Sequence, residues 1–306
     1  MADLQNIFKP VAGTRPKVAC EIRPEGVVAA RAGKKHGRIT MAFAPLPEGA
    51  VTPGLKVPNL VNAQAVRSAM ESALRDINAR AGAVTLVVPD AAARVLLLDF
   101  DTLPARRQEA LPVVRFRLRK MVPFDVENAA VSYQAMAAKD GQLNVLVTVM
   151  PGDVLEEYES AVRDAGYEPG AVLPSTLAAA AAVEGASATL MVNHTGASVT
   201  TAVTQGEEML LHRSMDLPAE PLAREEEMAQ AVITALAWYE DTLKGWPGTL
   251  YYAGPGGASA AARSRWISLV DPAPRIADLG APETASAMIS IPAGVSAGVT
   301  GALATE

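Results

Sequence analysis

The chain has 306 residues, of which half are hydrophobic, and a formal net charge of −6. This length allows two domains or one large two-lobed domain with sizeable apolar cores, and the mild acidity excludes a general polyanion-binding surface. The single cysteine, Cys20, excludes a disulfide framework within the chain and favours a reducing compartment. No apolar segment has the length of a signal-peptide core or a membrane span, so we expect a soluble, cytoplasmic protein.

Three short strands are predicted first, over 18–22, 27–31 and 38–43, because apolar runs alternate with the turn sequences RPEG and AGKKHG. After a loop rich in proline and glycine, Asn62 is expected to cap a helix with Val66, Met70 and Leu74 on one face. A short buried strand over 85–88 follows. These elements predict the start of a mixed α/β domain.

The middle of the chain predicts a strand over 95–100 and a helix marked by the stripe Leu111, Val114, Leu118 and Val122, which Pro112 either begins or kinks. Two strands over 129–136 and 143–150 come next. We expect Asp153 to cap a further helix that Gly166 ends.

The first pattern then returns. Strands are predicted over 189–192, 198–203 and 209–213, followed by a long helix, a strand over 249–253, the glycine-rich turn GPGGAS, a helix over 260–267 and a small-residue helix at the C-terminus. The stretches 17–43 and 188–214 have the same length and nearly the same turns. This indicates two related α/β lobes that face each other across a cleft, with chance similarity of two ordinary meanders as the alternative.

A local basic cluster lies at the end of the middle helix, where Arg115, Arg117, Arg119 and Lys120 surround Phe116. It is compatible with a nucleic-acid-binding helix, a solvated helix face or a docking surface. The acidic balance of the whole chain disfavours nucleic acid.

The segments VPDAAARVLLLDFDTLP, RFRLRKMVPFD and VENAAVSYQ resemble the PilM family of type IV pilus assembly proteins, which is FtsA-like and belongs to the actin-like ATPase superfamily. YYAGPGG and AGVSAGVTGALA resemble later elements of the family more loosely. The resemblance implies an α/β, actin-like fold with duplicated ribonuclease-H-like lobes and a reduced second-lobe subdomain. It divides the chain into a first lobe (1–93, continued by 167–187), an inserted αβ subdomain with two helices (94–166) and a second lobe (188–306).

The resemblance also implies a site for ATP and Mg²⁺ between the lobes. The matching positions are Glu21, Asn193, Thr195, Gly196, Ser198, Gly254, Gly256 and Gly257. Arg23 and Pro24 replace the family's glycine and hydroxyl residues, and Asn193 replaces an aspartate. Because proline removes an N–H donor and asparagine removes a charge, we expect nucleotide binding to be weak or lost, with no catalytic residue.

The partner that the resemblance implies is the N-terminal tail of a PilN-like membrane protein. Its binding surface is expected at Leu111, Val114, Phe116, Arg117 and Phe124. The competing interpretation is that the apolar members are core and the arginines are solvated. We expect a scaffold at the inner face of the inner membrane that also contacts other platform components, or itself as a homo-oligomer.

Two alternatives remain. An active ATPase that regulates assembly is supported by Glu21 and Thr195. A GspL-type secretion protein shares the fold, but a transmembrane helix is expected to follow its cytoplasmic domain.

Other chemistries have weaker support. The motifs G-x-x-x-x-G-K-[ST], G-x-S-x-G and H-E-x-x-H are absent from the sequence. His36, His194 and His212 lack cysteines at zinc spacing. Asp99 and Asp101 would share a strand face, which suits acid–base work or simple solvation.

Overall fold

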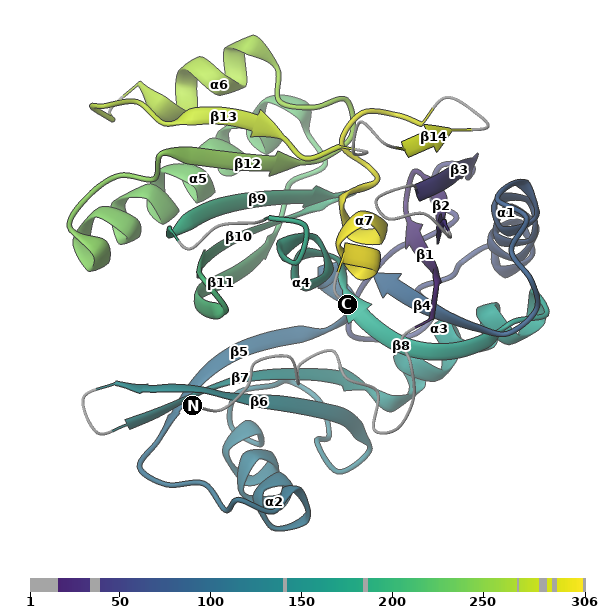
Figure 1. The fold of residues 1–306 in the computed structure, drawn as a ribbon, viewed down its shortest axis with the longest axis horizontal. Helices are drawn as coiled ribbons and strands as arrows, with labels where there is room; N and C mark the ends of the chain where they lie inside the picture. The colour runs from purple at the N-terminus through teal and green to yellow at the C-terminus, as the bar shows by residue number, and fades with distance from the viewer. Residues whose placement is uncertain are drawn as a thin grey trace.

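The structure is a computed structural model that describes residues 16–33, 39–139, 142–183, 187–268, 270–280, 285–287 and 291–304. Its described part contains three β-sheets (Figure 1). Two larger sheets lie side by side with the short helices α4 and α7 between them, and a smaller sheet with its own helix lies below. His36 and part of the turn before the third predicted strand lie outside the described residues.

The first sheet has the strand order β14-β3-β2-β1-β4-β8. Its members are β1 (Val18–Arg23), β2 (Gly26–Ala32), β3 (Ile39–Pro45), β4 (Ala83–Val88), β8 (Glu168–Pro174) and β14 (Ala285–Ala287). β1 to β3 form an antiparallel meander, whereas β4 pairs parallel with both β1 and β8. One face packs on α1 (Ala63–Asp76) and α3 (Gly152–Asp164), and the other on α4 (Ser175–Ala180) and α7 (Ala297–Ala304).

The second sheet repeats this plan with the order β11-β10-β9-β12-β13. Its strands are β9 (Thr189–Thr195), β10 (Ser198–Gln205), β11 (Glu208–Asp216), β12 (Thr249–Ala253) and β13 (Arg275–Asp278). Helices α5 (Pro221–Leu243) and α6 (Ala260–Ile267) cover its outer face. A meander followed by two parallel strands therefore occurs twice, which confirms the duplication. Only α5 and a short turn separate β11 from β12, as the reduced second-lobe subdomain predicts.

The third sheet is the body of the insertion, with the order β5-β7-β6. It contains β5 (Arg94–Phe100), β6 (Ala129–Lys139) and β7 (Gln142–Pro151). α2 (Arg107–Leu118) packs Val114 and Leu118 on one face. On the other face, Leu146 belongs to a buried cluster that also includes Met191 and Met209 of the second lobe. The sheet of the insertion thus packs on α2 with one face and on the second lobe with the other.

Several local predictions are confirmed and others are wrong. The Asn62 side chain accepts a hydrogen bond from Ala65 N–H at the start of α1. Pro151, not Asp153, is the N-cap residue of α3, and Pro112 lies inside α2 instead of beginning it. β8, α4, β13, β14 and the 3₁₀ turn η2 (Asp90–Ala92) lack the periodicity that a sequence argument needs.

Two proposed domain boundaries need correction. The sequence predicts α3 in the insertion, but Val154, Tyr158 and Val162 belong to the core of the first lobe, so the described part of the insertion has one helix. β14 and α7 were placed in the second lobe, yet β14 pairs with β3 and α7 packs on the first sheet. The chain thus returns to the first lobe at its C-terminal end. The rest of the division remains our proposal.

Candidate functional site

Two hairpin turns meet where the lobes face each other. In the first lobe, Arg23, Pro24 and Glu25 connect β1 to β2, and in the second lobe Gly196 lies between β9 and β10. Gly196 has a φ of +60°, and a Cβ added to it would lie 2.5 Å from Pro24 Cγ. The turns are therefore in direct van der Waals contact. We call this set, together with His194, the interlobe contact.

Hydrogen bonds join the same two turns. The Arg23 guanidinium donates to the backbone carbonyl of His194 at 3.1 Å, and Gly196 N–H donates to the Glu25 carboxylate at 3.2 Å. The Arg23 side chain is 1% exposed. Burial opposes its charge, but the Glu21 and Glu25 carboxylates, at 2.8 and 3.3 Å, outweigh this and hold the pKa of Arg23 above its usual value. A buried cation of the protein thus links the lobes.

The Glu21 carboxylate lies behind this arginine and is fully buried. Its Oε1 accepts hydrogen bonds from Arg23 and from the Ser175 hydroxyl, both at 2.8 Å, whereas Oε2 has no partner among the described residues. Burial raises the pKa of Glu21 above its usual value, although Arg23 and Ser175 act in the opposite direction. Gly298 of α7 closes the remaining side, because a Cβ there would lie 2.4 Å from Oε2.

Asn193 belongs to a second buried cluster beside Glu21. Its amide donates to the Thr176 and Ser175 hydroxyls at 2.9 and 3.1 Å and to the Asp90 carboxylate at 3.3 Å. Asp90 also accepts from the Thr176 backbone N–H at 3.0 Å and from its hydroxyl. The fold therefore brings Asn193 close to Glu21, as predicted, but the side-chain NH₂ group of Asn193 is already hydrogen-bonded within the protein.

The remaining predicted nucleotide residues also make internal contacts. Thr195 and Ser198 are buried, and their hydroxyls lie 3.2 Å apart. The glycine turn packs on the segment that leads into α7. Gly256 N–H donates to Ala293 O at 3.0 Å, and a Cβ on Gly294 would overlap Gly254 O. Gly257 N–H donates to Gly254 O within the turn itself.

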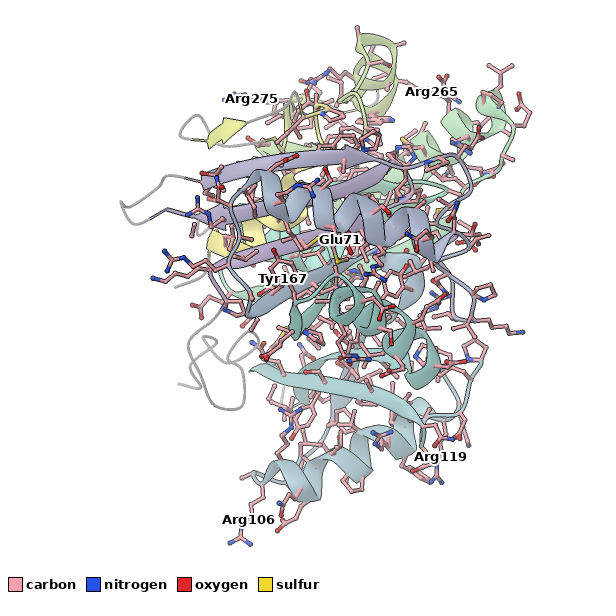
Figure 2. All side chains as sticks on the ribbon, turned by 90° about the vertical axis from the view of Figure 1, so that its right-hand side faces the viewer. Glu71, Arg106, Arg119, Tyr167, Arg265 and Arg275 are labelled. Atoms are coloured by element: carbon pink, nitrogen blue, oxygen red, sulfur yellow. The ribbon has the colours of Figure 1, made fainter. Side chains whose placement is uncertain are left out.

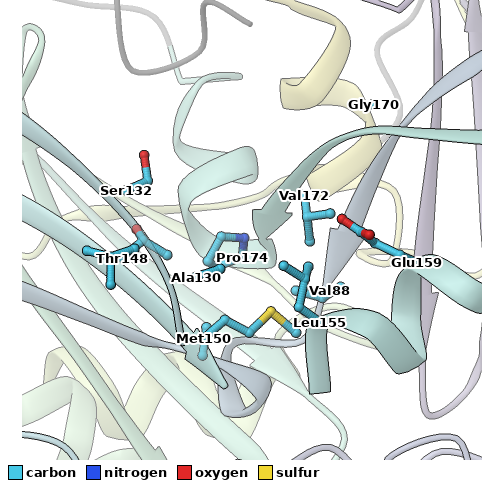
Figure 3. A pocket seen from close by; sticks show the side chains of 12 residues that line it. Val88, Ala130, Ser132, Thr148, Met150, Leu155, Glu159, Gly170, Val172 and Pro174 are labelled. Carbon is cyan, nitrogen blue, oxygen red and sulfur yellow. The ribbon is translucent and has the colours of Figure 1, made fainter. Parts of the chain in front are cut away.

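A cavity of about 220 Å³ opens elsewhere, between the insertion and the first lobe (Figure 3). Edge strand β6 contributes Ala130, Val131 and Ser132 to its lining, while β8 contributes Gly170, Val172 and Pro174. Met150 and Leu155 add apolar surface, and Glu159 of α3 supplies a carboxylate at one side. We call this the junction cavity.

The predicted partner-binding residues do not form one surface. Val114 is fully buried and Phe124 packs on the core of the insertion, while Leu111 is half-buried. Phe116 is 70% exposed on the outer side of α2. Arg117 lines a separate polar cavity of about 450 Å³ with Asp99, Asp101 and Gln142. Val114 lies on the core-facing side of α2. The prediction that Val114 belongs to a partner-binding surface is therefore wrong.

Searches with the sequence alone find no matching family model and no matching curated protein. A chain of the PilM-PilN type IV pilus biogenesis complex superposes with a TM-score of 0.75 at 17% identity, covering 96% of this chain and 100% of that chain. This chain has the actin-like ATPase fold. A Bacteroides thetaiotaomicron VPI-5482 protein with actin-like ATPase fold and unknown function superposes with a TM-score of 0.50 at 9% identity, covering 91% and 93% of the two chains.

The cytoplasmic domain of EpsL, an inner membrane component of the type II secretion system of Vibrio cholerae, superposes with a TM-score of 0.50 at 12% identity, covering 94% of this chain and 92% of that domain. The predicted actin-like fold is thus confirmed over nearly the whole length of this chain. Among the described residues, no helix is both long and apolar enough to cross a bilayer.

The actin-like cleft is the place where a metal-bound nucleotide would have to fit. Gly196 N–H, which a phosphate would need, already donates to a carboxylate. The described part of the chain contains no group of three or more His, Cys, Asp or Glu side chains that could hold a metal ion. The eight predicted nucleotide positions lie in or next to β1, β9, β10 and β12, but neither the junction cavity nor the polar cavity includes any of them. The residues present do not fit Mg²⁺ and a triphosphate, because the Arg23 cation is already neutralised by Glu21 and Glu25 and the Gly196 N–H is already bonded.

Sequence reasoning missed the residues that make the interlobe contact. The sequence predicts Arg23 and Pro24 only as losses from a phosphate cradle and Glu25 only as part of the RPEG turn, and it assigns no role to Asp90. The signal was present in the duplication itself. Because the two homologous hairpins face each other, the charged RPE turn of the first lies opposite the glycine of NHTG in the second. A turn with a cation and an anion opposite a glycine turn predicts direct contact between the two turns.

Proposed function

We propose that this chain is a cytoplasmic actin-like scaffold of the type IV pilus inner-membrane platform that binds the N-terminal tail of a PilN-like membrane protein. The observation that carries the proposal is the end-to-end similarity to a chain of the PilM-PilN complex, at a TM-score of 0.75. Its work is assembly, through the tail and through other platform components, and not turnover of a substrate.

The junction cavity is the site that we propose for the tail. In the sheets that the described residues form, β6 and β8 are both edge strands, so each has a row of backbone groups that no strand of those sheets pairs. An extended peptide can add to such an edge with its backbone while its side chains enter adjacent pockets. Met150, Val172 and Leu155 provide an apolar pocket, and the Glu159 carboxylate offers an acceptor for a basic side chain. We therefore expect a short tail with alternating apolar residues and at least one cation.

The interlobe contact supports a scaffold over an active ATPase. An ATPase cycle needs an anion cradle that opens to phosphate, whereas here the Arg23 cation and Glu25 carboxylate satisfy each other and the opposite turn. Opening the cleft would leave a buried cation without its partners, which is costly. The lobes are held together by protein groups where a nucleotide would otherwise bridge them.

Calorimetric titration of the full chain tests the proposal. We would titrate Mg-ATP and a synthetic peptide from the N-terminal tail of a PilN-like protein, each alone and each in the presence of the other. We expect peptide binding in the micromolar range or tighter without heat from ATP. ATP binding that changes the affinity for the peptide would favour the active ATPase, and an absence of peptide binding would refute the pilus role.

A further inference from the structure

The outer side of α2 has an exposed stripe that the fold does not use. Val113, Phe116, Arg117, Lys120 and Met121 follow the spacing i, i+3, i+4, i+7 and i+8, so they share one side of the helix and the turn that continues it. The three apolar members are 38%, 70% and 47% exposed, and both basic members are exposed as well. We call these five residues the outer stripe.

Exposed large hydrophobic side chains are otherwise scattered. In the described part of the chain they are Val57, Val61, Val113, Phe116, Met121 and Leu222. Half of them thus belong to one stripe of less than three helical turns. A single exposed apolar residue is ordinary, but a cluster of them marks an interaction site.

The charge around the stripe is opposite to that of the whole chain. Residues 105–122 contain six basic residues and one acidic residue, Glu109, whereas the chain has a net charge of −6. Arg106 pairs with Glu109, Arg119 pairs with Glu127, and Arg115 donates to backbone carbonyls. Within the described ranges, Arg117 and Lys120 form no ion pair. Two cations without an ion pair therefore flank Phe116, and Arg117 also lines the polar cavity that contains Asp99 and Asp101.

α2 also lies at the periphery of the molecule. It covers the far side of the insertion, away from both lobes (Figure 1). Figure 2 shows Arg106 and Arg119 near opposite ends of this helix, both pointing away from the body of the protein. The exposed stripe thus belongs to a helix at the periphery of the molecule.

We propose that the outer stripe docks on the surface of an anionic lipid bilayer. Phe116, Met121 and Val113 enter the boundary between headgroups and acyl chains, while Arg117 and Lys120 contact lipid phosphates. This combination of an aromatic and aliphatic face with lysine and arginine is typical of interfacial helices, and anionic lipids supply the complementary charge. A convex helix face suits a bilayer better than an extended peptide, which needs a groove. The site is separate from the junction cavity and does not require that cavity to bind a tail.

Flotation of the full chain with vesicles tests this inference. One set contains phosphatidylcholine alone and the other contains phosphatidylcholine with about one third phosphatidylglycerol. We expect the protein to float with the anionic vesicles at low salt and to be released from them as the salt concentration rises. It should not float with the neutral vesicles. Phe116→Ser, which keeps every charge, and the double variant Arg117→Gln with Lys120→Gln, which keeps every apolar group, should each lower the bound fraction about tenfold or more.

Leu222→Ser is the matched control. Leu222 is 75% exposed on α5, but its neighbours include Glu220, Glu225 and Glu226, so its loss should leave vesicle binding unchanged. All the substituted side chains are exposed, and unfolding midpoints equal to that of the wild type establish that the variants fold. Failure of the wild-type chain to float would overturn the proposal. Loss with the charge variant alone would also overturn the proposed insertion of the apolar side chains, because a purely electrostatic contact with the vesicle surface needs no Phe116.

Discussion

The interlobe contact and the junction cavity are both places where two parts of the chain meet, but their chemistry is opposite. At the interlobe contact, the protein fills the space with its own cation, carboxylates and a proline that touches the opposite glycine. At the junction cavity, two edge strands face an opening of about 220 Å³ that is lined mainly by apolar side chains. The actin-like cleft is closed by the protein, whereas the boundary next to the insertion is left open.

This difference indicates where binding energy remains available. Polar groups that are already paired gain little from a ligand, because each new hydrogen bond replaces an existing one. Unpaired strand edges beside an apolar pocket gain both backbone hydrogen bonds and buried area. We therefore expect mutations at the first site to change the stability of the protein, and mutations at the second to change its affinity for a peptide.

The largest effect is expected for Arg23→Ala. The change leaves the buried Glu21 carboxylate and the His194 carbonyl without their cationic partner, which should lower the free energy of unfolding by about 3–5 kcal/mol. Urea unfolding measures this loss. Arg67→Ala is the control, because Arg67 pairs with Glu71 on an exposed helix face with 48% of its side chain accessible, and its loss should cost about 0.5 kcal/mol or less. Equal effects of the two variants would show that Arg23 does not link the lobes.

Gly196→Ala should have the next largest effect. A methyl group at this φ of +60° is strained and also overlaps Pro24. Gly206→Ala isolates the strain, because Gly206 has a φ of +57° in the turn between β10 and β11, with no atom within 4 Å of the added Cβ. We expect about 1 kcal/mol of destabilisation at position 206 and about 2–3 kcal/mol at position 196.

Thermal unfolding of both variants, together with Pro24→Ala and the double variant, completes the test of this turn contact. Removing the proline ring should recover part of the excess loss at position 196, since the two residues then no longer collide. Strictly additive effects of the two substitutions would contradict contact between the turns.

The sequence predicted the lobes better than their interface. The meanders repeat with the same turn chemistry, so β1 to β3 and β9 to β11 follow from local pattern alone. Asn62 and Gly166 mark helix ends by rules that act within a few residues. Pairing of β14 with β3 depends on contacts across more than two hundred residues, and three residues carry no periodicity that could indicate it.

The candidate site shows the same limit. The positions of Glu21 and Asn193 followed from the resemblance, but what their side chains contact depends on α4, which brings Ser175 and Thr176 to them. Val114 was assigned to a partner surface although its spacing already placed it on the apolar stripe with Leu118. Burial decided that question, and a sequence pattern alone does not tell which side of an amphipathic helix faces a partner.

Ala130→Arg tests the junction cavity itself. Ala130 is exposed on edge strand β6 and lines the opening, so an arginine there should fill it and lower the affinity for the PilN-like peptide about tenfold or more without changing stability. Ala261→Arg, at an exposed position of α6, controls for the added charge. Calorimetric titration distinguishes the two variants. Unchanged affinity in Ala130→Arg would place the tail outside the junction cavity.

The smallest effect concerns pH and the interlobe contact. Burial lowers the pKa of His194, whose Nε2 lies 2.9 Å from Gly196 O and whose Nδ1 lies 3.4 Å from the Tyr252 hydroxyl. Because the unfolded chain binds a proton more readily than the folded one, stability should be fully present above the ordinary histidine pKa of about 6.5 and should fall as the pH drops below it. His194→Gln removes this titration while it keeps a polar side chain. Unfolding measured from pH 8 to pH 5 should therefore show a steeper acid loss in the wild type than in the variant, and parallel curves would mean that His194 is solvated and that this side of the contact opens.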